Sequence, residues 1–172
     1  GMGRGVLLLF LGWVYLSVGG GIFVLLPHHW GIPDTALLMV TYVAFRLPLR
    51  GDIYALLMGL SMDAFSGHPL GLNGSSKLLL FYLLRSLSRK FDLERWFIRP
   101  LVVAGAGMID AGVIFILLRV AGRPLTCSLG QVICCSVTLA LLQPLIFFLN
   151  DRSLSLWGRL TSKVSYHVLE RR

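Results

Sequence analysis

Long apolar runs, separated by short polar turns, dominate the chain. A helix needs about 20 mostly apolar residues to cross a lipid bilayer, and three runs reach that length. A longer apolar region between the first two runs is cut twice by polar segments that contain proline and glycine, so it predicts three further helices. The six spans expected from this pattern are 5–26, 33–47, 53–65, 71–87, 97–118 and 129–149.

The second and third spans, 33–47 and 53–65, are short for a full crossing. We expect them to be tilted, shielded by neighbouring helices or partly re-entrant, because irregular backbone at membrane depth must be buried in protein. The apolar run of the first span continues too far for a cleaved secretory signal, so we expect an uncleaved helix there.

Composition agrees with a membrane protein. The chain has 172 residues, of which 56% are hydrophobic and 14% are charged, whereas about a quarter of the residues in soluble domains are charged. There are too few polar residues to cover a soluble surface, and too many apolar residues for a disordered chain. We therefore expect one all-α integral membrane domain over residues 1–172, with no internal repeat.

The basic residues predict how this domain is oriented, because lysine and arginine accumulate in cytoplasmic loops. If the N-terminus is cytoplasmic, thirteen of the 16 basic residues fall on the cytoplasmic side. They are Arg4, Arg46, Arg50, Arg85, Arg89, Lys90, Arg95, Arg99, Arg152, Arg159, Lys163, Arg171 and Arg172. Only Arg119 and Arg123 fall in outer loops, and Lys77 lies inside a span. The bias supports six transmembrane helices with both termini in the cytoplasm.

Two of the basic segments, 85–99 and 150–172, combine their charges with apolar residues. The second is a basic amphipathic cytoplasmic tail, in which Trp157, Leu160 and Val164 recur at helical spacing. Segments of this kind lie at the membrane surface and contact anionic lipid; docking of a cytoplasmic partner protein is the alternative. No basic stripe lies on a soluble face, so the net charge of +8 does not indicate a nucleic-acid partner.

Ionisable residues inside a span are costly and are candidates for function. There are three, Asp63, Lys77 and Asp110. At about 1.5 Å of rise per residue, Lys77 and Asp110 lie at the same depth, as do Asp63 and Asn73. We therefore predict a Lys77–Asp110 ion pair and an Asp63–Asn73 polar contact, with Asp63 as an alternative partner of the long Lys77 side chain. A proton relay would need a longer chain of such groups, so we favour a role in helix packing.

No constellation for catalysis or metal binding stands out. The histidines and cysteines considered are His28, His29, His68, Cys127, Cys134 and Cys135. The histidines lack tetrahedral ligand spacing, and the cysteines lie near or within the last span, where free cysteine usually behaves as a small apolar residue. Neither a nucleophile–base pair nor a phosphate-binding glycine loop is present. We therefore expect no enzyme activity, no cofactor and no metal.

The segment 59–73 is the most distinctive part of the chain. It reads Gly59-Leu60-x-x-Asp63-Ala64-x-x-Gly67-x-Pro69-Leu70-Gly71-Leu72-Asn73, a helix that ends in glycine, a turn with proline and the start of another helix. This pattern resembles the hallmark of the rod shape-determining protein MreD family. Pro33-Asp34 before an apolar run, Pro144 near the end of the last span and the basic tail agree with the resemblance, which covers nearly the whole chain.

The resemblance implies a non-catalytic subunit of the bacterial cell-elongation (rod) complex in the cytoplasmic membrane. Such proteins associate with MreC and, through it, with MreB, RodA and a class B penicillin-binding protein, and they support peptidoglycan synthesis and cell shape. The family also resembles the substrate-binding subunits of energy-coupling-factor transporters, which have six helices and a pocket for a vitamin. A small-molecule-binding transporter subunit is therefore the alternative function.

Each candidate residue then has an expected role. The residues expected to shape the outer turn between the third and fourth spans are Asp63, Gly67, Pro69, Gly71 and Asn73. Lys77 and Asp110 are expected to hold the core together, and Pro144 is a further candidate for structure or partner contact.

Overall fold

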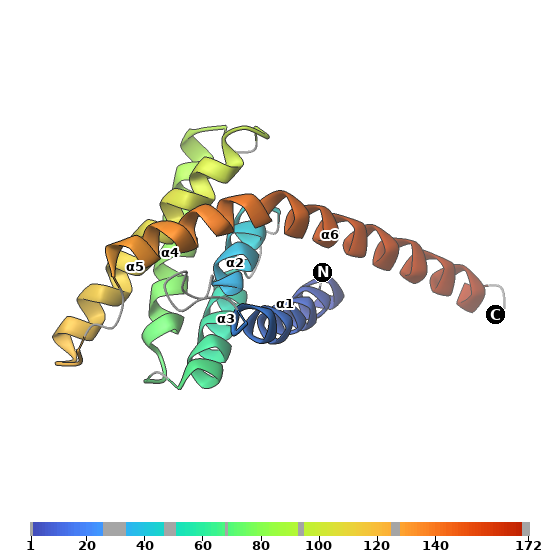
Figure 1. Ribbon diagram of the computed structural model, residues 1–172. Coiled ribbons are helices and arrows are strands. Elements are labelled where there is room, and N and C mark those ends of the chain that lie inside the picture. Colours follow the sequence, from blue (N-terminus) through green and yellow to red (C-terminus); the bar gives the residue numbers. More distant parts are fainter. Residues whose placement is uncertain are drawn as a thin grey trace.

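The computed structural model describes residues 2–25, 34–46, 51–67, 69–92, 95–124 and 128–169, with the backbone alone for Met2, Phe23 and 162–169. Its elements are α1 (Met2–Phe23), α2 (Thr35–Arg46), α3 (Gly51–Ser66), α4 (Leu72–Lys90), α5 (Arg99–Val120) and α6 (Leu129–Leu169). No strand occurs in these ranges (Figure 1). A helix is present at each expected span, with its ends shifted by a few residues in α1 to α5 and its end extended to Leu169 in α6, so the all-helical fold is confirmed.

Three helices of the described part are long and apolar enough to cross a membrane. The qualifying segments are Gly3–Ile22 in α1, Arg99–Val120 in α5 and Leu129–Thr161 in α6. They correspond to the three long apolar runs of the sequence, and they are compatible with a membrane protein. Helix α2 is apolar but has only 12 residues. Crossing by α2, α3 and α4 stays a prediction.

The short helix α2 lies at the centre of the fold and packs against the other five helices. Every residue from Thr35 to Ala44 is buried. Tyr42 packs edge-on against Phe147 of α6, with their ring centroids 5.1 Å apart. Neighbouring helices therefore shield α2, which is one of the three arrangements expected for so short a span.

Helices α3 and α4 form an extensive antiparallel pair (Figure 1). Gly59 allows their backbones to meet, because a Cβ added there would lie 2.6 Å from the carbonyl oxygen of Asn73 and from Cα of Gly74. Gly12 has a similar role between α1 and α3, since a Cβ there would lie 2.7 Å from the Met58 side chain. Small residues thus bring helices of this bundle into close contact.

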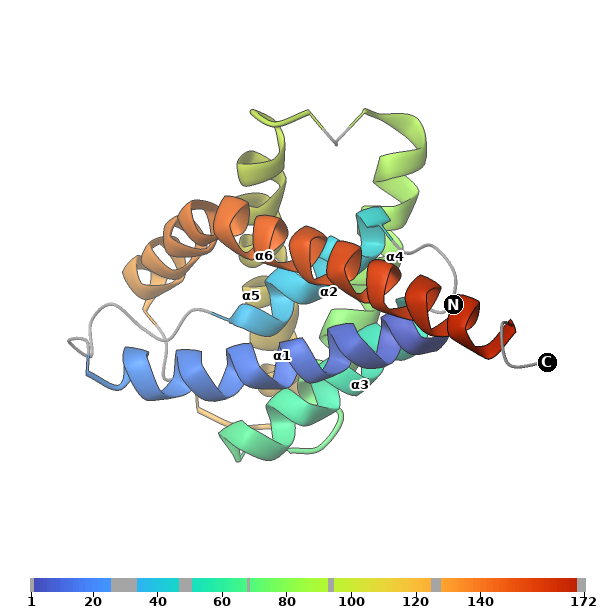
Figure 2. The same ribbon diagram turned by 90° about the vertical axis from the view of Figure 1, so that its right-hand side faces the viewer.

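Helix α6 is continuous from Leu129 to Leu169, so the chain does not break where the last span was expected to end. Pro144 lies inside it. Because proline has no N–H and its ring clashes with the preceding turn, a helix bends at such a residue. Figures 1 and 2 show α6 arching over the bundle. Its first limb (129–143) packs against α5, and its second limb (145–161) passes over α2 to the start of α1.

The outer faces of the long helices are apolar. Leu101 and Ile116 on α5 are 76% and 61% exposed, and Leu141 on α6 is 73% exposed. Contiguous apolar surface of this kind is rare on soluble monomers, and it is typical of helices that contact lipid or another protein. Polar side chains are buried inside the bundle, and five of them, Asp63, Asn73, Ser76, Lys77 and Asp110, belong to the site described next.

Candidate functional site

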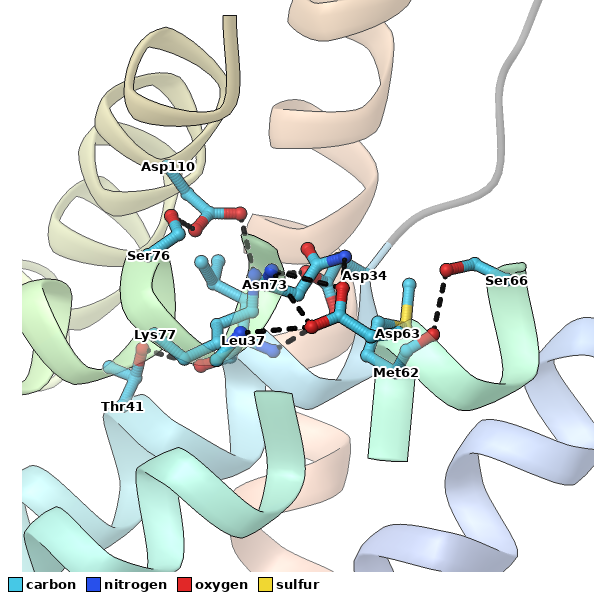
Figure 3. A network of polar contacts seen from close by, with 11 residues as sticks. Asp34, Leu37, Thr41, Met62, Asp63, Ser66, Asn73, Ser76, Lys77 and Asp110 are labelled. Atoms are coloured by element: carbon cyan, nitrogen blue, oxygen red, sulfur yellow. Dashed lines mark hydrogen bonds and ion pairs between the residues drawn. The ribbon is translucent and has the colours of Figure 1, made fainter. Parts of the chain in front are cut away.

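A buried lysine joins three elements of the bundle (Figure 3). The Lys77 side chain on α4 is 0% exposed, and its Nζ lies 2.6 Å from Oδ2 of Asp110 on α5. This is the predicted ion pair. The same Nζ lies 2.5 Å from Oδ2 of Asp34, directly before α2, a contact that depth along the spans did not predict.

The second oxygen of each carboxylate is bound as well. The Ser76 hydroxyl donates to Oδ1 of Asp110 at 2.5 Å, and the backbone N–H of Leu37 donates to Oδ1 of Asp34 at 3.3 Å. Asp34 therefore caps the first turn of α2 with one oxygen and binds Lys77 with the other. Because charge-assisted hydrogen bonds are strong, these contacts fix α2, α4 and α5 relative to one another.

Asp63, near the end of α3, caps the start of α4. Its carboxylate oxygens lie 2.9 Å from the backbone nitrogen of Gly71, 3.0 Å from that of Asn73 and 3.3 Å from that of Gly74. The side-chain amide of Asn73 donates a further bond of 2.8 Å, which is the predicted Asp63–Asn73 contact. The first N–H groups of a helix lack partners within it and favour a nearby negative charge. A carboxylate from α3 thus satisfies the N-terminus of α4.

The turn between α3 and α4 depends on glycine. Gly67 and Gly71 have φ angles of 68° and 100°, in the left-handed region that side chains disfavour. Gly71 precedes α4 and provides no side-chain cap of its own, so the N-terminus of α4 is open to Asp63. Pro69 lies between the two glycines, and its carbonyl accepts a bond of 3.2 Å from the N–H of Leu72, where α4 begins.

Apart from Pro144, the candidate residues lie together on α3, α4, α5 and the turn that joins α3 to α4. Pro144 lies inside α6, where it bends the helix. Lys77 does not use its alternative partner, because the oxygens of Asp63 are taken by α4. His28, His29, His68 and Cys127 lie outside the described residues, and Cys134 and Cys135 lie on α6 and form no disulfide with each other.

Asp34 is the candidate residue that sequence reasoning missed. An acidic residue directly before an apolar helix is a usual N-cap, and this signal was present. The start of α2 lies beside Lys77 because of the way α2 packs in the centre of the bundle. An estimate of depth along each span does not include this lateral packing. With Asp34, two carboxylates face one ammonium group, and the cluster has an excess of formal negative charge.

The ionic cluster is suited to holding helices together. Lys77 is enclosed, and Asp34 and Asp110 are only 18% and 7% exposed, so a substrate in solution would not reach the ammonium group. Within the part of the chain that the structure describes, no group of three or more His, Cys, Asp or Glu residues could hold a metal ion. The chemistry available here is therefore electrostatic attraction and hydrogen bonding between helices.

A cavity of about 280 Å³ lies between α1, α2 and α3, beside the turn. Its lining is mostly apolar and consists of Leu16, Ser17, Gly20, Thr35, Met62, Phe65 and Ser66. The hydroxyls of Ser17 and Ser66 donate to carbonyls of their own helices, at 2.9 and 2.7 Å. Typical ligand pockets are larger, with a few polar groups that orient the ligand, so this cavity gives little support to a vitamin site.

Comparisons of the chain with protein-family models, with curated proteins and with solved structures find no match.

Proposed function

We propose that the chain is a non-catalytic membrane scaffold of the bacterial cell-elongation (rod) complex, associating with an MreC-like protein. Through that partner it would associate with MreB, RodA and a class B penicillin-binding protein, in support of peptidoglycan synthesis and cell shape. The observation that carries the proposal is the Asp63 cap, whose hydrogen bonds join the two ends of the distinctive segment 59–73 and the start of α4. A rigid turn at the end of a helix pair is a suitable surface for a protein partner.

The enclosed ionic cluster supports a scaffold rather than an enzyme or a transporter subunit. Both carboxylates of the cluster are bound on both oxygens, and Lys77 is buried between them. Groups that act on a substrate must be accessible to it. A fully satisfied, enclosed cluster instead fixes the geometry of a bundle, which is what a scaffold that presents surfaces to partners requires.

The proposal places the chain in the cytoplasmic membrane with six spans and both termini in the cytoplasm. In spheroplasts of cells that express a variant with its native cysteines replaced by serine, we expect a membrane-impermeant maleimide to label Arg123→Cys. Arg89→Cys should stay unlabelled until detergent is added, because α4 would end on the other side. Both arginines are exposed in the fold. If Arg89→Cys alone is labelled, the chain has the orientation opposite to the one proposed. If both variants are labelled equally, the two positions lie on the same side, which contradicts an odd number of crossings between them.

Association with MreC is the direct test of the function. We expect the tagged chain to capture co-expressed MreC from membranes, and we expect Asp63→Asn to lower the recovery several-fold. Asparagine keeps the shape of the side chain but loses its charge and one acceptor for the three backbone N–H groups of the turn. Recovery is measured by immunoblot of the eluate, normalised to the tagged chain.

Asp52→Asn is the matched control, because Asp52 is also an aspartate of α3 but lies at its opposite end, where it accepts a bond of 2.9 Å from the N–H of Ile53. This variant should recover MreC as the wild type does. Failure of the wild-type chain to capture MreC would overturn the proposed function. Normal recovery with Asp63→Asn would leave that function intact and remove the turn from the interface.

A further inference from the structure

The outward face of α6 changes its chemistry along the helix. In the crossing part it is formed by large exposed apolar side chains, Leu141, Leu145 and Phe148. The same face continues into the second limb with exposed Arg152, Leu156, Arg159 and Leu160. Apart from the neighbours Arg159 and Leu160, these positions recur every three or four residues, so they form one stripe on the helix. Arginine enters the stripe only after residue 149.

Charged and polar side chains of neighbouring helices appear at the same level as this change. Asp151 on α6 accepts a hydrogen bond of 2.7 Å from the Tyr42 hydroxyl and lies 3.4 Å from the Arg46 guanidinium, at the end of α2. Where α3 begins, Asp52 accepts a bond of 3.4 Å from the hydroxyl of Tyr82 on α4. Four helices thus become polar together. In a membrane protein such a level marks the edge of the hydrocarbon layer.

The second limb of α6 is held against the bundle. Leu154 packs against the hydrophobic core, and the Trp157 ring lies close to α1, since a Cβ added at Gly3 would lie 3.3 Å from its Nε1. Figure 2 shows this limb beside the first half of α1. The inner face of the limb is therefore occupied, and its stripe of arginine and leucine is turned outward.

We propose that the stripe Arg152, Leu156, Arg159 and Leu160 binds the headgroups of anionic phospholipids. Guanidinium groups bind phosphate oxygens with paired hydrogen bonds, and the two leucines lie beside the arginines on the same exposed face. Lipid rather than a protein is favoured because the stripe continues the apolar, lipid-facing stripe of the same helix without a break. This inference depends on the membrane placement of α6 and not on the association with MreC, so each proposal can fail without the other.

The test uses the full-length protein in phosphatidylcholine vesicles that contain a photoactivatable phosphatidylglycerol. Crosslinks are mapped to residues 150–161, and unlabelled phosphatidylglycerol is titrated as the competitor. Each basic residue near an anionic surface contributes about 1 kcal/mol, so the double variant Arg152→Gln, Arg159→Gln should bind phosphatidylglycerol at this segment about 30-fold more weakly. Raised salt should weaken binding by the wild type, because screening acts on exposed charges.

Arg119→Gln with Arg123→Gln is the matched control, since it removes two exposed positive charges at the end of α5, one in its last turn and one just after it. It should leave the crosslinks at 150–161 unchanged. If the control loses crosslinks at 150–161 to the same extent, the effect is one of net charge alone and the proposed lipid site is wrong. The proposal is also overturned if the wild type crosslinks a photoactivatable phosphatidylcholine at this segment as well as phosphatidylglycerol. If the stripe captures a cytoplasmic protein and gives no lipid crosslinks, the lipid proposal is wrong and the stripe is a protein-binding surface.

Discussion

Replacing Lys77 by methionine should lower the free energy of unfolding by about 3–5 kcal/mol, the usual cost of removing one partner from a buried ion pair. Methionine fills much the same volume but provides no positive charge. Asp34 and Asp110 would then face each other without the ammonium group that lies 2.5 and 2.6 Å from them. Thermal unfolding of the purified protein in detergent, followed by fluorescence-detected size exclusion, measures the loss.

Because Asp34 also contacts Lys77, removing Asp110 alone should not restore all of the lost stability. Lys77→Met with Asp110→Leu removes the original pair but leaves Asp34 unpaired, so only part of the stability should return. Adding Asp34→Asn removes the last charge and keeps an acceptor for the N–H of Leu37. We expect the triple variant to be clearly more stable than the double variant. A double variant as stable as the wild type would show that Asp34 is not coupled to Lys77.

Lys90→Met is the control for this series, because Lys90 is an exposed lysine at the end of the same helix. Surface substitutions away from special contacts change stability by less than about 0.5 kcal/mol. If Lys77→Met destabilises the protein no more than Lys90→Met, the buried ion pair has no role in stability.

The contacts that the sequence predicted are those set by helix rise and a short connection. Lys77 and Asp110 are level along their helices, and Asp63 and Asn73 are separated by one tight turn, so depth alone brings each pair together. Asp34 precedes a helix whose position depends on five neighbours, and depth along the chain contains no information about lateral packing. The hydrogen bonds from the backbone N–H groups of Gly71 and Gly74 to Asp63 could not be predicted either, because every residue except proline has a backbone N–H group.

The course of α6 shows a different limit of the sequence. The last span was expected to end at residue 149 and to be followed by an amphipathic tail at helical spacing, and the structure joins both in one helix that continues to Leu169. Proline removes one hydrogen bond and bends a helix without having to end it. Contacts of Leu154 and Trp157 with the bundle then stabilise the continuing limb. These contacts need α1, which is far away in sequence.

Gly59→Ala should be the most disruptive small substitution in the bundle, with a loss of about 3 kcal/mol. The added Cβ would lie 2.6 Å from two atoms of the α4 backbone, the carbonyl oxygen of Asn73 and Cα of Gly74. Backbone atoms within a helix cannot rotate away as a side chain can, so α3 and α4 must separate, and overpacking of this kind typically costs 1–3 kcal/mol or more. Thermal unfolding in detergent again measures the change.

Gly105→Ala is the matched control on α5, where a Cβ would meet nothing within 4 Å. Alanine is the better helix former by about 1 kcal/mol, so this variant should be as stable as the wild type or slightly more stable. Equal stability of Gly59→Ala and Gly105→Ala would contradict the close contact between α3 and α4.

Gly59 and Asp63 are one helical turn apart on α3, so the same close approach that Gly59 permits also brings the Asp63 carboxylate to the start of α4. The two residues should therefore be coupled. We expect the capping bonds to be longer in the Gly59→Ala variant, so Asp63→Asn should cost less stability there than in the wild type. A double-mutant cycle measures the difference, with a coupling energy of about 0.5–3 kcal/mol expected for residues that share one contact. Additive effects would mean that the cap forms independently of the helix contact, and the segment 59–73 would then not act as one unit.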